Sequence, residues 1–306
     1  MVDRSSHGDA RTVLVTGGAG FIGSHLVDAL VARDIRVRVL DNFVTGVRTR
    51  INPAARLLEA DVCDPSAIRD AFNGVDCVFH TAARPRVMYA IEHPLEAHLT
   101  NVVGTLNVLI AARDARVRRL IFSGSSSVYG EQSVMPLRET MTPNPLNPYA
   151  LQKLTAEQYT RLFHHLYGLQ TLTLRYFNVY GPRMALEGPY VTVIGIFLDQ
   201  RRHDQPLTIH GDGHQTRDFT HVRDVVRANL LAMDCAIADG RAVNIGRGRS
   251  VSVAQIAAKI GGPVVHMPPR IADAHDTLAD ISEARAVLGW NPTVTTEDGI
   301  SELMAS

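Results

Sequence analysis

The glycine-rich segment at residues 17–23 constrains the fold of this chain more than any other feature. It reads GGAGFIG, follows a β-rich run at residues 12–16, and leads into a periodic apolar segment at residues 21–33 that predicts a helix. Glycines in this spacing allow a tight turn, the approach of a pyrophosphate to the backbone, and close packing of helix on strand. The first turn of the helix offers free N–H groups to phosphates. The segment therefore predicts a strand, turn and helix that bind a dinucleotide.

Strand and helix patterns alternate along the first half of the chain. Further strands are predicted at residues 35–40, 56–59, 77–79, 120–122 and 172–174, and helices at residues 65–72, 95–113 and 149–167. Such alternation predicts a parallel sheet with helices on both faces. The expected fold class is α/β, a Rossmann-type doubly wound parallel sheet with a smaller C-terminal α/β lobe.

The pattern loosens after about residue 179, which predicts the second lobe. A short strand is expected there at residues 206–210, and helices at residues 221–233 and 253–260. We predict a flexible arm at residues 1–11, an NAD-binding domain at residues 12–178 to which residues 221–246 return, and a substrate lobe formed mainly by residues 179–306. The two lobes are expected to pack together and leave a cleft between them.

The composition excludes several classes of protein. Hydrophobic residues make up 45% of the chain and charged residues 20%, and Lys plus Arg equals Asp plus Glu at 31 each, so no net field favours nucleic acid or membranes. No apolar run is expected to reach membrane-spanning length, and the polar start lacks the apolar core of a secretory signal. Cys63, Cys77 and Cys235 lack metal-ligand spacing, and their odd number argues against a disulfide framework. We expect no metal site and a cytoplasmic location.

Acidic and small residues at predicted strand ends fit the same dinucleotide. Asp41 ends the second predicted strand, about 20 residues after the glycine turn, where a carboxylate binds the ribose 2′-hydroxyl and repels a 2′-phosphate. This favours NAD over NADP. Asp61 ends the third strand, where a carboxylate would meet the adenine amino group, and Ala82 and Ala83 end the fourth, where small side chains leave room for the cofactor.

A second group of residues has the parts of a proton-transfer site. Tyr149 and Lys153 are four residues apart on a predicted helix, downstream of the serine run that begins at Ser125. Positions i and i+4 share a helix face, so the Lys153 ammonium is expected within electrostatic reach of the Tyr149 hydroxyl. A neighbouring cation favours the phenolate, which would make Tyr149 a usable base near neutral pH.

With the glycine loop, Asp41, Ser125, Tyr149 and Lys153 in this order, the chain resembles the extended short-chain dehydrogenases/reductases that act on nucleotide sugars, most of all the UDP-hexose 4-epimerases. The motifs that carry the resemblance read FSGSSSVYG at residues 122–130, NPY at 147–149, RYFNVYGPR at 175–183 and RDF at 217–219. The resemblance implies that Tyr149 takes the proton of the sugar 4-hydroxyl while hydride passes to NAD. Ser125 would orient the same oxygen and Lys153 would hold the nicotinamide ribose. The 4-keto sugar would then turn over and take the hydride back on its other face.

The resemblance also implies two sets of binding residues. Those for NAD are Gly17, Gly20, Phe21, Ile22, Gly23, Asp41, Asn42, Asp61, Val62, Ala82, Ala83, Asn101, Tyr149, Lys153 and Tyr176. Those for the UDP-sugar are Ser126, Ser127, Asn178, Val193, Ile209, Arg217, Arg270, Asp273 and Thr277. A homodimer is expected through the helices at residues 95–113 and 149–167.

The residues after Ser125 discriminate among reactions. Related dehydratases carry an Asp-Glu pair there, and related decarboxylases carry a Glu at the second position, whereas this chain has Ser126 and Ser127. Epimerisation is therefore favoured over elimination of water. An NAD-dependent 4-ketoreductase or dehydrogenase stays open as an alternative, and a regulatory NAD-binding protein is disfavoured because the three catalytic residues are intact.

The sugar itself is left open between neutral and acidic hexoses. Thr277 stands where strictly glucose-selective members carry a bulky Tyr, so UDP-glucose and UDP-N-acetylglucosamine are both allowed. UDP-glucuronate is the alternative, with Ser126, Ser127 and Arg183 as candidates to bind its carboxylate. Glucuronate epimerases often have Thr in place of Asn178 and Arg in place of Ala185, which counts mildly against it. Arg84 and Arg86 are further candidates to face the sugar, but a solvated loop is expected for them, and the orientation of Arg84, Arg86 and Arg183 is not predicted.

Overall fold

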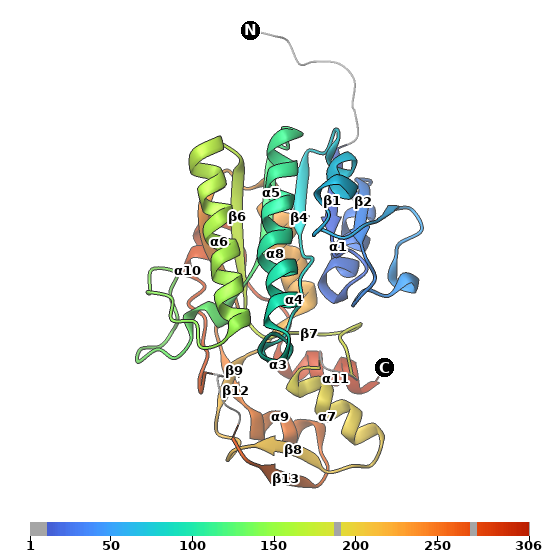
Figure 1. Cartoon of the computed structure of the whole chain (residues 1–306). Helices are drawn as coiled ribbons and strands as arrows, with labels where there is room; N and C mark the ends of the chain where they lie inside the picture. Colours follow the sequence, from blue (N-terminus) through green and yellow to red (C-terminus); the bar gives the residue numbers. More distant parts are fainter. Residues whose placement is uncertain (1–10, 187–190, 270–273, 306) are drawn as a thin grey trace.

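The computed structural model describes residues 11–186, 191–269 and 274–305, and its main feature is a seven-stranded sheet (Figure 1). The predicted arm lies almost wholly outside the described residues. All strand pairings in the sheet are parallel, and the order is β11-β6-β5-β4-β1-β2-β3. The strands are β1 (Thr12–Thr16), β2 (Arg36–Asp41), β3 (Arg56–Glu59), β4 (Cys77–His80), β5 (Arg119–Ser125), β6 (Gln170–Tyr176) and β11 (Asp239–Ile245). The predicted doubly wound fold is confirmed.

Helices cover both faces of the sheet because alternate residues of the central strands point to opposite sides. Val13 and Val15 of β1 share a core with α1 (Phe21–Val31), α8 (Val222–Asp234) and α10 (Ser282–Leu288). Leu14 belongs to the core on the other face, with α2 (Pro65–Ile68), the 3-10 turn η2 (Arg69–Phe72), α5 (Thr105–Asp114) and α6 (Pro148–Tyr167). Each fully buried Val or Leu stabilises this sandwich by about 1.5–3 kcal/mol.

A long composite helix runs down one face of the sheet. It consists of α4 (Pro94–His98), the π-helical segment η3 (Leu99–Gly104) and α5. Contrary to the prediction, this 21-residue helix is long enough and, with a mean hydropathy of 1.2 in its most apolar window, apolar enough to cross a membrane. Its Val108, Leu109 and Ala112 are fully buried in the core beside the sheet. In this structure the segment therefore packs as a core helix of the domain.

The second lobe lies below the carboxyl ends of the strands in Figure 1. It contains α7 (Val193–Arg202), β8 (Leu207–His210), β9 (Thr216–Asp218), β12 (Ser250–Ser252), α9 (Val253–Ile260), β13 (Val264–Met267) and α11 (Thr296–Ala305). β8 pairs with β13, β9 with β12, and the short strands β7 (Val179–Tyr180) and β10 (Thr220–His221) pair with each other. A separate core of apolar residues from α7, β8, α9 and α11 holds this lobe together.

The chain returns to the sheet after entering the second lobe. α8 packs against α1, and β11 pairs in parallel with β6 at the edge of the sheet. This is the path that the predicted return of residues 221–246 requires, although the division into domains stays a prediction. β5 and β6 are longer than the predicted residues 120–122 and 172–174. The prediction ended β5 too early because Ser123, Gly124 and Ser125 are not apolar, whereas in the structure they continue the pairing with β6.

Candidate active site

A cavity of about 1180 Å³ lies between the carboxyl ends of the strands and the second lobe. This end of a doubly wound sheet is where such folds bind their ligands. The predicted site residues that line the cavity are Gly17, Gly20, Phe21, Ile22, Gly23, Asp41, Asn42, Val62, Ala82, Ala83, Ser125, Ser126, Ser127, Tyr149, Lys153, Tyr176, Asn178, Val193, Arg217 and Thr277. The cavity therefore joins the two predicted binding sites into one.

The glycine loop forms a cradle that side chains would fill. Gly17 has a φ of +69°, and a Cβ atom on it would lie 2.6 Å from the backbone nitrogen of Ala82. A Cβ atom on Gly23 would collide with the carbonyl oxygen of Gly17. Only glycine fits at these positions, and the space that they leave open lies at the start of α1, where N–H groups face the cavity. The loop thus fits the pyrophosphate of a dinucleotide.

Asp41 lies at the end of β2 and ties this loop together. Its carboxylate accepts hydrogen bonds from the N–H groups of Ala19 at 2.9 Å and Phe43 at 2.8 Å. Burial raises the pKa of the Asp41 carboxyl, and these two hydrogen bonds oppose that rise. Because each carboxylate oxygen accepts one N–H and has a further lone pair, Asp41 can still accept hydrogen bonds from ribose hydroxyls.

Three predicted binding residues do not line the cavity. Asp61 accepts a hydrogen bond from the Asn42 side chain at 2.8 Å and so positions a residue that does line it. Asn101 in η3 is buried, and Ile209 on β8 belongs to the core of the second lobe. The sequence pattern identified the strands and helices that carry these residues but not the direction of their side chains.

Ser125 and Tyr149 form the reactive centre of the cavity. Ser125 ends β5 and caps the 3-10 turn η4 (Ser126–Tyr129), and its hydroxyl lies 2.8 Å from that of Ser127. Tyr149 lies in the first turn of α6, which Asn147 caps, because the Asn147 side chain accepts the N–H of Ala150 at 2.9 Å. The Tyr149 hydroxyl is hydrogen-bonded to Ser125.

Lys153 is buried and contacts β5, and its predicted action on Tyr149 stays a prediction. Its ammonium donates a hydrogen bond to the Ser123 carbonyl at 3.0 Å and lies 4.9 Å from the centre of the Phe122 ring, so the side chain lies along β5. Burial lowers the pKa of Lys153 to about 8. Burial also raises the pKa of Tyr149, while the hydrogen bond with Ser125 and the positive charge of Arg86 oppose that rise. Arg86 is thus one cation that favours the phenolate.

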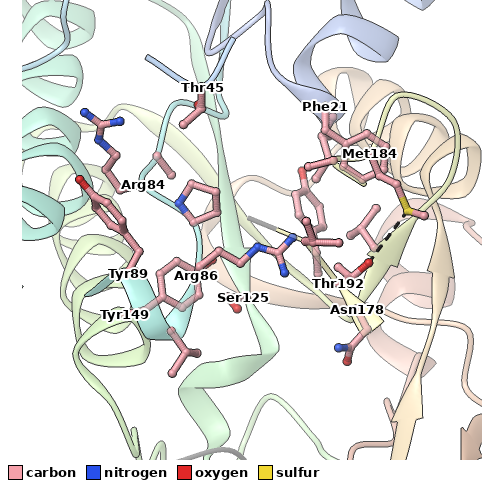
Figure 2. A pocket seen from close by; sticks show the side chains of 18 of the residues that line it. Phe21, Thr45, Arg84, Arg86, Tyr89, Ser125, Tyr149, Asn178, Met184 and Thr192 are labelled. Atoms are coloured by element: carbon pink, nitrogen blue, oxygen red, sulfur yellow. Dashed lines mark hydrogen bonds between the residues drawn. The ribbon is translucent and has the colours of Figure 1, made fainter. Parts of the chain in front are cut away.

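Arg84, Arg86 and Arg183, whose orientation was not predicted, make different contacts. Arg84 forms an ion pair with Glu96 at 3.0 Å, and Arg183 forms one with Asp28 at 2.7 Å. Both Arg84 and Arg86 line the cavity, and Arg86 lies beside Tyr149 and Ser125 (Figure 2). Its backbone has a φ of +106°, which costs a non-glycine residue about 1–3 kcal/mol.

The second lobe contributes the far wall of the cavity. Arg217 donates hydrogen bonds to the carbonyl oxygens of Thr216 at 2.9 Å and His275 at 2.8 Å, which fixes its guanidinium at the cavity wall. Thr277 is almost fully buried, and its hydroxyl accepts the N–H of Asp218 at 3.3 Å. The predicted residues Arg270 and Asp273 lie outside the described residues.

Some residues of this wall escaped prediction. Gln200, His210 and Gln215 also line the cavity, from α7, β8 and the loop before β9. Gln200 donates to Thr208 at 2.8 Å, and Gln215 donates to the His210 carbonyl at 2.7 Å. These glutamines belong to no sequence motif that would have predicted them as site residues. Only the packing of α7 on β8 brings them to the cavity.

Comparison with known proteins agrees with this geometry. Residues 13–246 match the model of the NAD dependent epimerase/dehydratase family, and the chain belongs to that family. It is 39% identical over 300 residues to a putative UDP-glucose 4-epimerase of Methanocaldococcus jannaschii, covering 95% of this chain and 97% of that protein. The predicted family and its NAD dependence are therefore confirmed.

Two solved structures show how far the similarity extends. The chain has a TM-score of 0.92 and 37% identity to the UDP-glucose 4-epimerase of Thermotoga maritima with UDP-glucose, covering 96% of this chain and 97% of that one. It has a TM-score of 0.90 and 32% identity to the UDP-N-acetylglucosamine 4-epimerase of Methanobrevibacter ruminantium M1 in complex with UDP-N-acetylmuramic acid, covering 97% and 99%. Both similarities extend over both lobes.

Proposed function

We propose that the protein inverts the configuration at C4 of a UDP-hexose with NAD as its cofactor. The observation that carries this proposal is the hydrogen-bonded pair of Ser125 and Tyr149 in a single cavity that reaches from the glycine cradle to Arg217 on the second lobe. One end of the cavity fits a dinucleotide and the other a nucleotide sugar. The reacting carbon of the sugar then lies between them.

The residues of the chain divide the proton chemistry among them. NAD, when bound, supplies the acceptor and later the donor of the C4 hydride. The Tyr149 phenolate removes the proton of the 4-hydroxyl and returns it at the end, and the Ser125 hydroxyl orients the same oxygen. Lys153, fixed on the Ser123 carbonyl, presents its remaining N–H groups to the cofactor ribose. The sugar leaves with its C4 inverted and no net oxidation.

The neighbourhood of Ser125 supports epimerisation over elimination. Ser126 and Ser127 both line the cavity where an acid and a base would be needed to remove water from C5 and C6. The serine hydroxyls cannot serve as the acid and the base of an elimination. A net 4-ketoreductase or dehydrogenase would use the same residues, and it differs by consuming a stoichiometric amount of cofactor.

The size of the cavity supports UDP-glucose and UDP-N-acetylglucosamine as substrates, and UDP-glucuronate as the alternative. Thr277 lines the cavity with a small side chain, which leaves room for an N-acetyl group. Arg183, the arginine proposed for a uronate carboxylate, does not support that part because it is paired with Asp28.

A homodimer is proposed as the working form of the enzyme. Leu151, Leu162 and Leu166 lie on one face of α6 and are 54, 47 and 62% exposed, and Leu95 on α4 is 72% exposed. Such a stripe on two neighbouring helices fits the equivalent helices of a second copy. That the protein works in the cytoplasm stays a prediction.

The function is tested by incubating the purified protein separately with UDP-glucose, UDP-N-acetylglucosamine and UDP-glucuronate without added cofactor. Resolving the C4 epimers of each sugar is expected to show conversion of at least one of them to an equilibrium mixture. If none of the three is converted, the proposed function is wrong. Accumulation of NADH in step with product would favour the dehydrogenase instead.

A further inference from the structure

Arg50 is a cation of the cavity wall that the proposed chemistry does not use. It ends the 3-10 turn η1 (Arg48–Arg50), is half-buried, and lines the same cavity as Gly17 and Gly20. Its guanidinium makes no hydrogen bond or ion pair with any part of the chain that the structure describes. Removing a charged group partly from water without a partner costs free energy, so an anion is expected beside it in the working protein.

The segment that carries Arg50 is attached to the glycine loop and to α1. The N–H of Val47 donates to the Ala19 carbonyl at 3.0 Å, and the N–H of Arg50 donates to the Val47 carbonyl at 2.9 Å. Just after η1, the Asn52 side chain donates to the Asp28 carboxylate of α1 at 2.8 Å. These contacts hold the segment along the start of α1, next to the N–H groups that suit a pyrophosphate.

The charge that acts on Arg50 is that of another arginine. Burial lowers the pKa of Arg50, and the positive charge of Arg183 lowers it further. The Asp28 carboxylate already pairs with Arg183 at 2.7 Å and accepts the hydrogen bond from Asn52, so it is taken by other partners. Two like charges at the edge of a cavity repel each other, and an anion bound beside them would offset this repulsion.

The pyrophosphate of NAD is the anion that suits this position. It carries two negative charges, and the glycine cradle offers them backbone N–H groups and the partial charge of a helix end. A guanidinium presents several N–H groups in one plane and binds phosphate oxygens in pairs. The diphosphate of the UDP-sugar has the same chemistry, but the proposed site for it is at the other end of the cavity, on the second lobe.

We propose that Arg50 binds the pyrophosphate of NAD and so slows the release of the cofactor. The proposal deepens the proposed function, since it assigns to the cofactor a residue that neither the glycine pattern nor the acids at the strand ends predict. Arg50 acts on binding and not on the hydride or proton steps. A reaction without net oxidation requires a tightly held cofactor, because the same NAD must return the hydride that it removed.

The test follows the exchange of bound NAD for labelled NAD in the purified protein. ADP and adenosine compete in this exchange, and the ratio of their inhibition constants measures the contribution of the diphosphate. The variants are Arg50→Met, Arg50→Lys and the control Arg48→Met. Arg48 belongs to the same 3-10 turn, but it is paired with Glu59 at 2.6 Å and does not line the cavity. In a second arm, UDP and uridine are compared by calorimetry in the protein with its NAD bound.

Arg50→Met is expected to speed the release of NAD and to lower the preference for ADP over adenosine about 10- to 100-fold, as the loss of hydrogen bonds to a charged group predicts. Arg50→Lys is expected to restore part of both effects, because an ammonium keeps the charge without the planar N–H pairs. Arg48→Met should change neither. The preference for UDP over uridine should stay the same in all variants.

An unchanged ratio of ADP to adenosine binding in Arg50→Met would overturn the proposal. An equal loss of ADP and adenosine binding would overturn it as well, because it would show that Arg50 only shapes the loop. A fall confined to the ratio of UDP to uridine would assign the guanidinium to the diphosphate of the substrate and contradict the proposal too. None of these measurements needs turnover of a sugar, so the proposal and the proposed function fail separately.

Discussion

Tyr149 is the residue on which the proposed chemistry depends most. Its hydroxyl meets Ser125 at the end of β5, and the two residues that follow Ser125 in η4 are Ser126 and Ser127. We expect Tyr149→Phe to keep NAD bound and to lose kcat by about 10²-fold or more, because the phenol is both the base and the acid. The amount of NAD released on denaturation measures whether the cofactor is still bound, and the rate of epimer formation measures kcat. Near-wild-type activity would remove Tyr149 from the mechanism.

Arg86 gives a second prediction at the scale of single residues. If Tyr149 works as a phenolate, kcat/KM rises with pH through the pKa of Tyr149, which the charge of Arg86 lowers. Arg86→Met should raise this pKa and move the rising limb to higher pH, measured with UDP-glucose. Arg183→Met should leave the limb in place, because that guanidinium is paired with Asp28. A limb that does not move in Arg86→Met would show that its charge does not reach Tyr149.

Single residues also mark the limit of sequence-based prediction here. Ser125, Tyr149 and Lys153 could be predicted because their spacing and their order along the chain are constrained by the chemistry. The direction of Lys153 could not, because its flexible stem can follow either the Tyr149 face or the Ser123 carbonyl. Nor could the different contacts of Arg86 and Arg84 be predicted, since only the loop backbone decides that Arg84 pairs with Glu96 while Arg86 lies near Tyr149.

At the scale of elements, α6 is the support of the catalytic centre. It carries Tyr149 and Lys153, and one turn further Glu157 forms a buried ion pair with Arg175 of β6 through two hydrogen bonds. Removing one partner leaves an uncompensated charge in the interior. This pair therefore fixes α6 on the sheet.

We expect Glu157→Gln to destabilise the protein by about 3–5 kcal/mol, as for other broken buried pairs. The matched control is Glu59→Gln, which breaks the exposed pair of Glu59 with Arg48 and should destabilise the protein far less, because solvent screens that pair. Denaturant unfolding of both variants measures the difference. Similar costs for the two substitutions would contradict the proposed role of the buried pair.

The elements themselves were largely predictable, with errors that have a common cause. Apolar periodicity found β3 and α9 at the observed residues, because β3 begins and ends on a charged residue and α9 lies between Ser252 and Gly261. It shortened β5 and β6, whose last residues are polar where they approach the cavity. The composite helix of α4, η3 and α5 was predicted as one helix, but its π-helical turn at Asn101 carries no local sequence pattern.

At the scale of the whole molecule, the exposed leucines of α4 and α6 predict a dimer. Leu162→Glu places a charge in the middle of that apolar face and should convert the protein to a monomer in sedimentation or light-scattering measurements. Met304→Glu on α11 is the control, since Met304 is 49% exposed but lies on another element. A wild-type protein that sediments as a monomer would contradict this assembly.

The two lobes together make the central claim, which is that one cavity removes a hydride from C4 of a sugar and returns it to the same carbon. The most direct test follows UDP-glucose carrying deuterium at C4, incubated with the purified protein without added cofactor. We predict UDP-galactose that retains the deuterium at C4, with no net NADH. Loss of the deuterium from C4, or its accumulation on free reduced cofactor in step with product, would contradict the account.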